Sequence, residues 1–191
     1  MTDWKERLTG KLEPVLMKPD PRPDLSAYHN LPCAIFHYPA EDEFDLRHQL
    51  SLLTTRLEGR GKRVTHISLA GLMKQALEAE VSIDDLIEAE KTLGLQTVVE
   101  TIHGVLSEYQ PLDKLVIESM PADGEPTRDI VFLVRAGWLF PFARTSPLLE
   151  QLQGRIDLPT ILFYPGTLDG PVGLRFMGVR DPEHSYRPKI F

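Results

Sequence analysis

Residues 33–69 decide the fold, and they read CAIFHYPAEDEFDLRHQLSLLTTRLEGRGKRVTHISL. The stretch begins with Cys33–Tyr38 and ends with Val64–Leu69, two short and mostly apolar runs typical of buried strands. Four leucines between them recur at helical spacing: Leu46, Leu50, Leu53 and Leu57. The sequence therefore predicts a strand, a helix and a strand, with Gly59 ending the helix in a left-handed cap. Because such a crossover joins parallel strands, we expect the two strands to be neighbours or near-neighbours in one sheet.

The rest of the chain continues the alternation of helices and strands. A short helix is predicted over residues 70–78. Ser82 begins a longer one, because Ser-Ile-Asp-Asp resembles a capping box, and Gly94 and Gly104 divide or loosen it. A further helix covers residues 147–153, with Ser146 as its N-cap. The remaining strands are predicted at Lys114–Ser119, Ile130–Val134, Thr160–Tyr164 and Gly173–Val179.

Two parts are expected along the chain. Residues 1–30 are expected to hold an N-terminal helix and a Pro-rich, extended connector. This helix packs either on its own domain or on a partner, with Trp4 as the anchor. Residues 31–191 are expected to form a single α/β domain, a mostly parallel sheet flanked by helices. Within it we expect a helical middle segment, about residues 70–110, and a C-terminal tail.

Length and composition narrow the class of protein. The chain has 191 residues, 42% of them hydrophobic, which suits a compact domain that needs no disulfides. No apolar run has the length of a membrane span and the N-terminus lacks a signal region, so we expect a cytoplasmic protein without a membrane partner. The net charge of −7 argues against a basic nucleic-acid binder. The balance is −9 over residues 70–127 and +2 over residues 128–191, so the C-terminal third can still meet an anionic partner.

Motifs for catalysis and cofactor binding are absent from the sequence. There is no GxxxxGK[ST], GxGxxG, GxSxG or HExxH, and the six histidines form no HxH or HxxxH pair. The single cysteine, Cys33, excludes an intramolecular disulfide and any multi-cysteine zinc site. We therefore expect a protein that is not an enzyme and holds neither metal nor cofactor. The alternative is an unrecognised catalytic site around Cys33, His37 and His66, if both histidines approach one face of the sheet.

The loops at the carboxyl ends of the parallel strands are the candidate binding site, because open α/β sheets bind ligands there. Arg135 follows an apolar strand, where it meets either a carboxylate of this chain or an anionic partner. Tyr164-Pro165-Gly166 has the composition of a type II turn, which leaves the aromatic residue unexplained. The C-terminal segment 186–191 is too apolar for a loose tail, so it docks on this domain or on a partner. A basic cluster is explained by the dipole of the helix it follows: Arg56, Arg60, Lys62 and Arg63.

Three C-terminal strings read RAGWLFPFARTSPLLEQLQG, LPTILFYPGTLDGPVGLRFMG and HSYRPKIF, and two upstream strings read CAIFHYPAEDEFDLRHQL and GKRVTHISL. Together they resemble the BrxB family, a small core component of BREX phage-defence systems, and the likeness covers roughly residues 31–191. The resemblance implies a role in restricting phage and in the host DNA methylation that marks self. It also implies partners: an alkaline-phosphatase-like protein, a DNA methyltransferase and a large ATPase. The family has no established catalytic residues, and its layout is similar to nucleotide-binding domains that lack a P-loop.

The resemblance and the missing motifs together predict an adaptor that assembles other BREX proteins. The alkaline-phosphatase-like component is the expected direct partner, the methyltransferase is a second one, and DNA is met only indirectly. The alternative is a nucleotide- or nucleic-acid-sensing subunit of the same system. Either function would use a surface made of strand-end and tail residues: Arg135, Trp138, Phe140, Phe142, Tyr164, Gly166, Tyr186, Arg187, Lys189 and Phe191. Sequence alone does not tell which aromatic residues of this set belong to the core and which belong to an interface.

Overall fold

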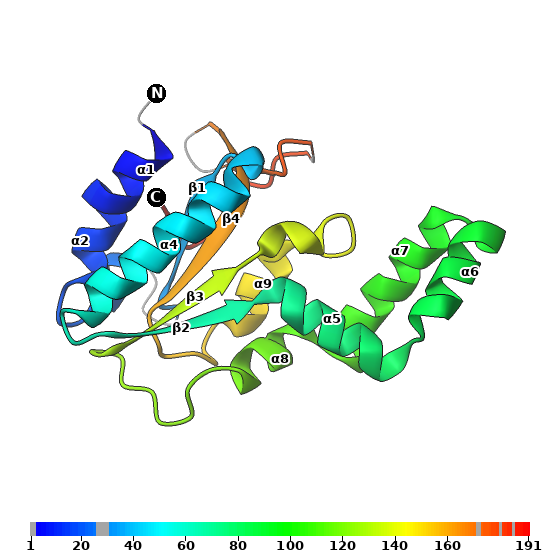
Figure 1. Ribbon diagram of the computed structural model, residues 1–191, viewed down its shortest axis with the longest axis horizontal. Helices are drawn as coiled ribbons and strands as arrows, with labels where there is room; N and C mark the ends of the chain where they lie inside the picture. Colours follow the sequence, from blue (N-terminus) through cyan, green and yellow to red (C-terminus); the bar gives the residue numbers. More distant parts are fainter. Residues whose placement is uncertain (1–2, 26–30, 171–172, 180, 185) are drawn as a thin grey trace.

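The fold is an α/β sandwich around one six-stranded sheet (Figure 1). The computed structural model describes residues 3–25, 31–170, 173–179, 181–184 and 186–191. The strands are β1 (Cys33–Tyr38), β2 (Arg63–Ser68), β3 (Asp129–Val134), β4 (Thr160–Asp169), β5 (Gly173–Phe176) and β6 (Lys189–Ile190). Their order is β2-β3-β4-β1-β6, with β5 paired to β4. All pairs are parallel except β4 with β5, which confirms the α/β class and the mostly parallel sheet.

The helices account for most of the remaining chain. They are α1 (Trp4–Arg7), α2 (Glu13–Leu16), α3 (Arg22–Leu25), α4 (Glu43–Glu58), α5 (Leu69–Glu80), α6 (Ile83–Leu93), α7 (Leu95–Gly104), α8 (Leu112–Glu118) and α9 (Thr145–Leu152). Two π-helical segments, Leu8–Leu12 and Val105–Tyr109, continue α1 into α2 and extend α7. Short 3-10 turns at Ala40–Asp42 and Ala136–Leu139 follow β1 and β3.

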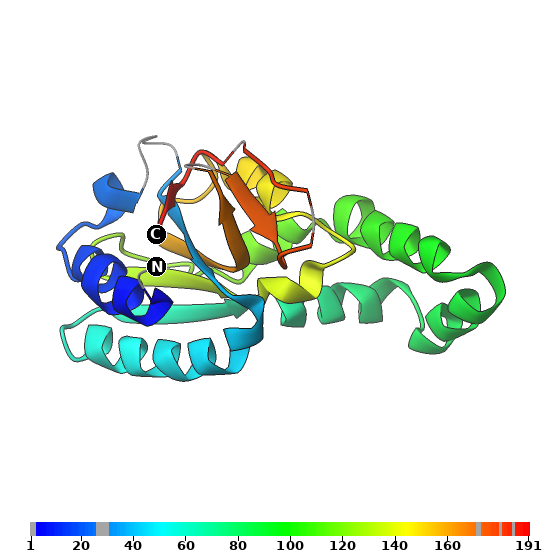
Figure 2. The same ribbon diagram turned by 90° about the horizontal axis from the view of Figure 1, so that it is seen from above.

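The sheet separates two hydrophobic clusters, as the layers in Figure 2 show. On one face, α1, α2 and α4 pack on side chains such as Phe36, Phe132 and Phe163. On the other, α5, α7, α8 and α9 pack on side chains such as Leu133 and Leu162. Successive residues of a strand point to opposite faces, so every central strand supplies both clusters. This explains why these strands read as continuous apolar runs.

The N-terminal helix belongs to the same core as the sheet. Trp4 is buried against the Tyr38 ring, and its Nε1 donates a hydrogen bond of 2.8 Å to Asp42. The sequence left open whether this helix packs on its own domain or on a partner, and it packs on its own domain. The Pro-rich connector is not wholly extended, because α3 forms within it and includes Pro23 at its second position, where a missing N–H is tolerated. The connector's residues 26–30 lie outside the described chain.

The strands of the opening crossover are parallel but not adjacent. β3 and β4 lie between β1 and β2, so the expected neighbour relationship is wrong. A helix of sixteen residues is long enough to carry the chain across several strands, and its sequence does not set how many are skipped. The predicted cap is also displaced, since Gly59 is right-handed and Gly61, at φ = 86°, makes the left-handed turn.

Three further expectations are wrong in detail. Residues 114–119 are not a strand; they lie in and just after α8, which buries Leu112, Leu115 and Val116 at helical spacing. Ser146 is not the N-cap of α9, which begins one residue earlier, at Thr145. Residues 164–166 form no type II turn, because β4 runs straight through them into a hairpin with β5.

A helical arm leaves the globular part of the molecule. We define the arm as residues 69–109, which run through α5, α6, α7 and the π-helical segment after them. Ser68 ends β2 and caps α5 by accepting a hydrogen bond from the Gly71 N–H, so the arm starts at the carboxyl edge of the sheet. Ser82 is the N-cap of α6 and Gly94, at φ = 92°, separates α6 from α7, as the sequence predicted. Gly104 does not divide the helix, because it is right-handed and α7 continues through it into the π-helical segment. Figures 1 and 2 show α6 and the start of α7 far from the sheet.

Candidate functional site

A crevice of about 350 Å³ opens at the carboxyl edge of the sheet. It lies between the turn after β1, the loop after β3 and the middle of β4. The connections after β1 and β3 run to opposite faces of the sheet, and ligands of open α/β sheets bind at such a point. The crevice is lined by ten residues: Ala40, Glu43, Arg47, Arg135, Gly137, Trp138, Phe140, Phe142, Pro165 and Met177. Four of the predicted surface residues, Arg135, Trp138, Phe140 and Phe142, are thus brought together.

Arg135 holds an unusual backbone conformation at the end of β3. Its φ and ψ of 59° and 37° are left-handed, a region that residues with a side chain seldom occupy. Its guanidinium is exposed, and no hydrogen bond or salt bridge joins it to another residue in the described ranges. An internal salt bridge, one of the two explanations open from the sequence, is therefore not observed among these residues. Left-handed strain at a ligand-binding edge is typical of functional positions.

A small polar network forms the opposite wall of the crevice. Glu43, in the first turn of α4, accepts hydrogen bonds from the Tyr38 hydroxyl and from Arg47 Nε, the latter at 2.8 Å. Burial raises the pKa of Tyr38, and the Glu43 carboxylate raises it further, so this hydroxyl stays a proton donor. The Arg47 guanidinium also lies over the Phe44 ring, 5.0 Å from its centroid. The wall therefore presents a fixed carboxylate next to a positioned cation.

A longer groove continues from the crevice along α4. It has a volume of about 660 Å³ and shares Glu43, Arg47 and Arg135 with the crevice. The groove follows α4 from Glu43 to Glu58, a length of roughly 22 Å at the helical rise per residue. Its floor is the exposed face of the edge strand β2, where His66 Nε2 lies 2.8 Å from Thr54 Oγ1. These dimensions suit an extended or helical segment of another protein better than a small metabolite.

Other members of the predicted surface lie in the core. Tyr164 is fully buried, with its ring 5.1 Å from that of Phe176 and 6.0 Å from that of Tyr186. Phe191 is also buried, and its N–H donates to the Ile35 carbonyl at 2.8 Å. These two aromatic residues therefore stabilise the fold and cannot anchor a partner.

Gly166 also has a packing role. A Cβ atom there would lie 2.3 Å from the Arg175 carbonyl oxygen of β5, so the close approach of the two hairpin strands requires glycine. The residue is buried within the hairpin. The glycine is therefore explained by strand pairing and not by ligand binding.

The C-terminal segment docks on its own domain, one of the two outcomes expected. β6 adds to β1, and the Tyr186 hydroxyl lies 3.0 Å from Thr145 Oγ1 of α9. Burial raises the pKa of Tyr186 to about 12. Arg187 is exposed and bonds Gln153 at 2.9 Å, while the exposed Lys189 lies over the Phe191 ring. None of these tail residues lines the crevice.

The three residues of the alternative catalytic site are not assembled. Cys33 starts β1 in the cluster beneath α5, α8 and α9, whereas His66 stacks edge-on against Phe132 on the opposite face of the sheet. His37 lies four residues along β1 from Cys33, about 13 Å at the rise of a strand. Burial raises the pKa of the Cys33 thiol to about 12, which removes its nucleophilic thiolate at neutral pH. His37 alternates in step with Cys33 and Ile35 and so faces the side of the sheet opposite to His66, which means that the two histidines do not share a face.

The basic cluster after α4 is used within the fold. Arg56 bonds both carboxylate oxygens of Glu13 at 2.7 Å. Lys62 is buried and donates to three backbone carbonyls, and Arg63 pairs with the buried Asp129. These contacts hold the N-terminal segment and the start of β3 in place. Only Arg60 of the cluster has no such bond among the described residues.

Sequence reasoning missed Glu43, Arg47 and Met177 as site residues. The signal for the first two was available, since the first turns of the helix after β1 always lie at the carboxyl edge of a parallel sheet. Met177 could not be found this way. It follows β5, takes a left-handed φ of 54°, and reaches the crevice only through the β4–β5 hairpin.

Comparison with known proteins identifies the family of the chain. The sequence model of a family described as BrxB, BREX protein BrxB, matches residues 65–190. The chain belongs to the BrxB family. The matched range includes most of β2, the arm, Arg135 and the loop with Trp138. The crevice therefore draws most of its lining from the matched range, whereas the α4 side of the groove lies before it.

Two curated proteins named BREX protein BrxB are similar to the chain. One, from Bacillus cereus (strain H3081.97), is 26% identical over 152 residues, which are 78% of each chain. The other, from Escherichia coli O9:H4 (strain HS), is 26% identical over 137 residues, 71% of this chain and 66% of the relative. No solved structure matches the chain. Within the described ranges, no helix combines the length and apolarity needed to cross a membrane.

Proposed function

We propose that the chain is a non-catalytic assembly component of a BREX complex, supporting phage restriction and host DNA methylation. The observation that carries this proposal is the exposed Trp138 beside Arg135 at the carboxyl edge of the sheet. Trp138 is 59% exposed, a large fraction for a tryptophan, and the Arg135 side chain has no hydrogen bond or salt bridge among the described residues. Tryptophan and arginine are the residue types that most often dominate binding at protein interfaces.

The separation of the candidate catalytic groups supports a role without chemistry. Cys33 and His66 lie on opposite faces of the sheet, and the crevice contains no nucleophile next to a base. Its polar groups are two arginines and one glutamate that is already hydrogen-bonded. Such a set recognises a surface and does not activate a substrate.

The partner in this proposal is the alkaline-phosphatase-like BREX protein, with the methyltransferase as a second contact. The groove along α4 offers that partner a site for one extended or helical segment. DNA is met through these partners, because the arginines and lysines near the groove end are engaged within the fold. We place the complex in the cytoplasm, where the host DNA lies.

Co-purification of tagged chain with each other BREX protein tests the proposal. We expect a stoichiometric complex with the phosphatase-like protein and at least tenfold weaker binding by Trp138→Ser. Leu168→Ser is the matched control, because Leu168 is a large exposed residue on β4, outside the crevice. A complex that Trp138→Ser leaves unchanged would remove the crevice from the interface. Isolation of the wild-type chain without any BREX protein would reject the adaptor role.

A sensor of nucleotides or nucleic acid is the second candidate, favoured by Arg47 and Arg135 at the strand ends. The first turn of α4 counts against it. In nucleotide-binding sheets the helix after β1 binds phosphate with its N-terminus, but here that turn carries Glu43 and Asp45. Titration with ATP and with duplex DNA at low salt separates the two functions, since only a sensor predicts saturable, salt-sensitive binding.

A further inference from the structure

The arm carries an apolar surface that the fold does not cover. α6 packs on α7 and turns Leu86 and Ala89 partly inward, but none of its side chains is buried. Ile83 and Ile87 lie one turn apart on the same helix and are 52% and 44% exposed. Leu93 and Leu95, on either side of Gly94 at the tip, are 67% and 60% exposed. We call these four residues the arm stripe.

Exposed large hydrophobic residues are concentrated in the arm stripe. Four of the ten exposed large hydrophobic residues in the described chain fall between residues 83 and 95. Single exposed apolar residues are ordinary on protein surfaces, whereas several that gather on one short projecting element indicate an interaction site. The four lie on a projecting element (Figures 1 and 2), which leaves them open to another molecule.

The arm is also strongly acidic. Residues 70–110 contain eight acidic and two basic side chains, Lys74 and Lys91. Lys74 pairs with Glu78 at 3.6 Å, and Glu80 and Glu100 accept hydrogen bonds from glutamines. On α6 itself, four carboxylates have no salt bridge within the described part of the chain: Asp84, Asp85, Glu88 and Glu90. The helix dipole explains the first two, which lie in the first turn, but not Glu88 or Glu90.

The negative charge of the arm limits the kinds of molecule that can bind to the arm stripe. An acidic surface repels both nucleic acid and anionic lipid, so neither fits. A second copy would bring two arms of like charge together through the same patch, which is unfavourable. An apolar protein surface flanked by lysines and arginines satisfies both the stripe and the carboxylates.

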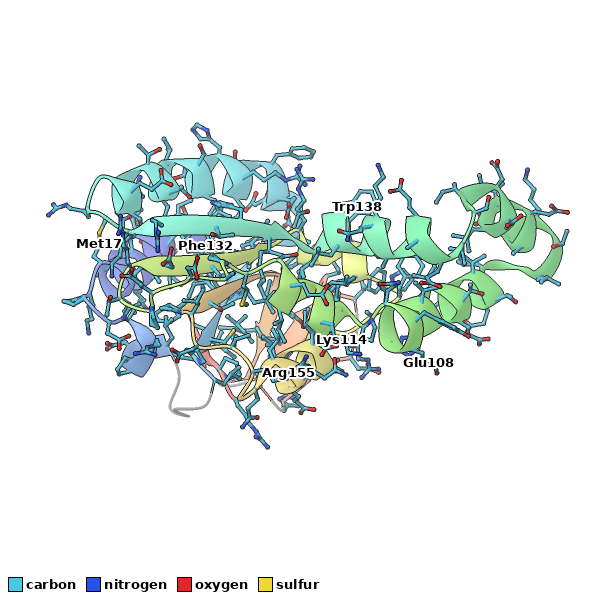
Figure 3. The ribbon with its side chains drawn as sticks, turned by 90° about the horizontal axis from the view of Figure 1, so that it is seen from below. Met17, Glu108, Lys114, Phe132, Trp138 and Arg155 are labelled. Carbon is cyan, nitrogen blue, oxygen red and sulfur yellow. The ribbon has the colours of Figure 1, made fainter. Side chains whose placement is uncertain are left out.

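We propose that the arm docks, through Ile83, Ile87, Leu93 and Leu95, into an apolar groove of a partner protein rimmed by basic side chains. The inference rests on the proposed function in one respect, which is that the partner is another BREX protein. It adds a second contact, since the arm stripe and the crevice are built from different elements. The arm and the crevice both lie at the carboxyl edge of the sheet. The turn that carries Trp138 packs on α5, at the base of the arm (Figure 3).

Two sets of full-length variants test the docking. The first replaces Ile83, Ile87 and Leu95 by Gln, which removes the apolar surface and keeps good helix formers at exposed positions. The second is Glu88→Lys with Glu90→Lys. The matched controls are Leu52→Gln, an exposed leucine on α4, and Glu118→Lys with Asp123→Lys, two exposed carboxylates outside the arm and distant in sequence from α6. Circular dichroism and thermal unfolding verify that each variant folds.

Binding to the purified phosphatase-like BREX protein is measured at about 50 and about 500 mM salt, a range over which surface electrostatics is strongly screened. We expect at least tenfold weaker binding by both arm sets, unchanged binding by both controls, and a smaller salt dependence for the lysine variant. Arm variants that bind as the wild type would overturn the docking while the adaptor role stands. Tighter binding by the lysine variant would also overturn it, because the partner would then be acidic.

Protection of cells against phage is the second readout and does not depend on which partner is chosen. If no BREX protein binds the wild-type chain, the adaptor role fails. The arm is then judged by protection alone. A folded arm variant that loses protection while its control keeps it supports the docking. A folded arm variant with full protection, or arm-dependent dimerisation of the chain in sedimentation, overturns it.

Discussion

Arg47 and Arg135 both line the crevice and the groove, although Arg47 lies on α4, which covers one face of the sheet, and Arg135 lies at the end of β3. The Arg47 guanidinium bonds Glu43 and lies over the Phe44 ring. The Arg135 side chain has no such contact in the described structure, and only its left-handed backbone sets its direction. The pair therefore combines a fixed cation with one that is free to meet a partner. Its position joins the crevice to the groove along α4.

Arg135→Gly is expected to stabilise the chain while weakening its complex. Glycine adopts the left-handed conformation freely, so the free energy of unfolding should rise by about 0.5 to 1 kcal/mol, the strain relieved less the chain entropy that glycine loses. Loss of the guanidinium should weaken partner binding at least tenfold. Urea unfolding and co-purification measure the two effects. Arg135→Ala is the control, because it removes the charge but keeps the strain. Lower stability of the glycine variant would show that the left-handed backbone carries no strain.

Phe191→Ala is expected to destabilise the fold and leave no selective effect on binding. The ring lies in the cluster under α1 and α4, and Phe-to-Ala changes in such a core lower the free energy of unfolding by about 3 to 5 kcal/mol. Lys189→Ala, two residues earlier and exposed, should change it by less than about 0.5 kcal/mol. Thermal unfolding of both variants measures the difference. Equal midpoints would mean that β6 is not docked in solution.

Cys33 is expected to resist thiol reagents in the folded protein. Its side chain is fully buried and burial raises its pKa to about 12, so both access and thiolate are lacking at pH 8. Absorbance after addition of an aromatic disulfide reagent should show no labelled thiol until denaturant unfolds the chain. Full labelling of the native protein within minutes would contradict this and would reopen the search for a nucleophile on β1.

The sequence predicts the layers of this fold better than its connections. The apolar runs at β1, β3 and β4 identify buried strands because both their faces are covered. Residues 114–119 mislead because Leu115, Val116 and Ile117 suit a strand equally well, and only the packing of α8 decides. Strand order is likewise set by tertiary packing. No local pattern records that α4 crosses two strands.

The residues of the candidate site likewise fall into those that the sequence predicts and those that only the fold reveals. Arg135 and Trp138 are recognisable because strand ends in parallel sheets point to the ligand edge. Tyr164 and Phe191 have the same composition signal as Trp138, yet their rings fill the core, and burial is a property of the whole fold. The arm shows the limit most clearly. Its helices follow from periodicity and capping, but its projection away from the sheet does not, so the exposure of Ile83 and Leu95 is visible only in three dimensions.

His37 is expected to make the fold sensitive to acid. Burial, with a smaller contribution from the Arg7 charge, lowers the pKa of His37 to about 4, whereas in the unfolded chain it titrates near 6.5. Between these two values the unfolded chain binds the proton and the folded chain does not. The stability contribution is therefore complete above about pH 6.5 and is lost as the pH falls towards 4. Because the ring is only half-buried, we expect a loss of about 1 to 2 kcal/mol.

The measurement is urea unfolding of the wild type and of His37→Gln at pH 7.5, 5.5 and 4.5. The wild type should lose stability across this range, and the variant should lose less, because glutamine does not titrate. An NMR titration of the His37 ring provides the direct check, and its pKa should lie well below the ordinary histidine value of about 6.5. Parallel pH profiles of the two proteins, or a His37 pKa near 6.5, would show that the ring is solvated and that the Arg7 contact does not form in solution.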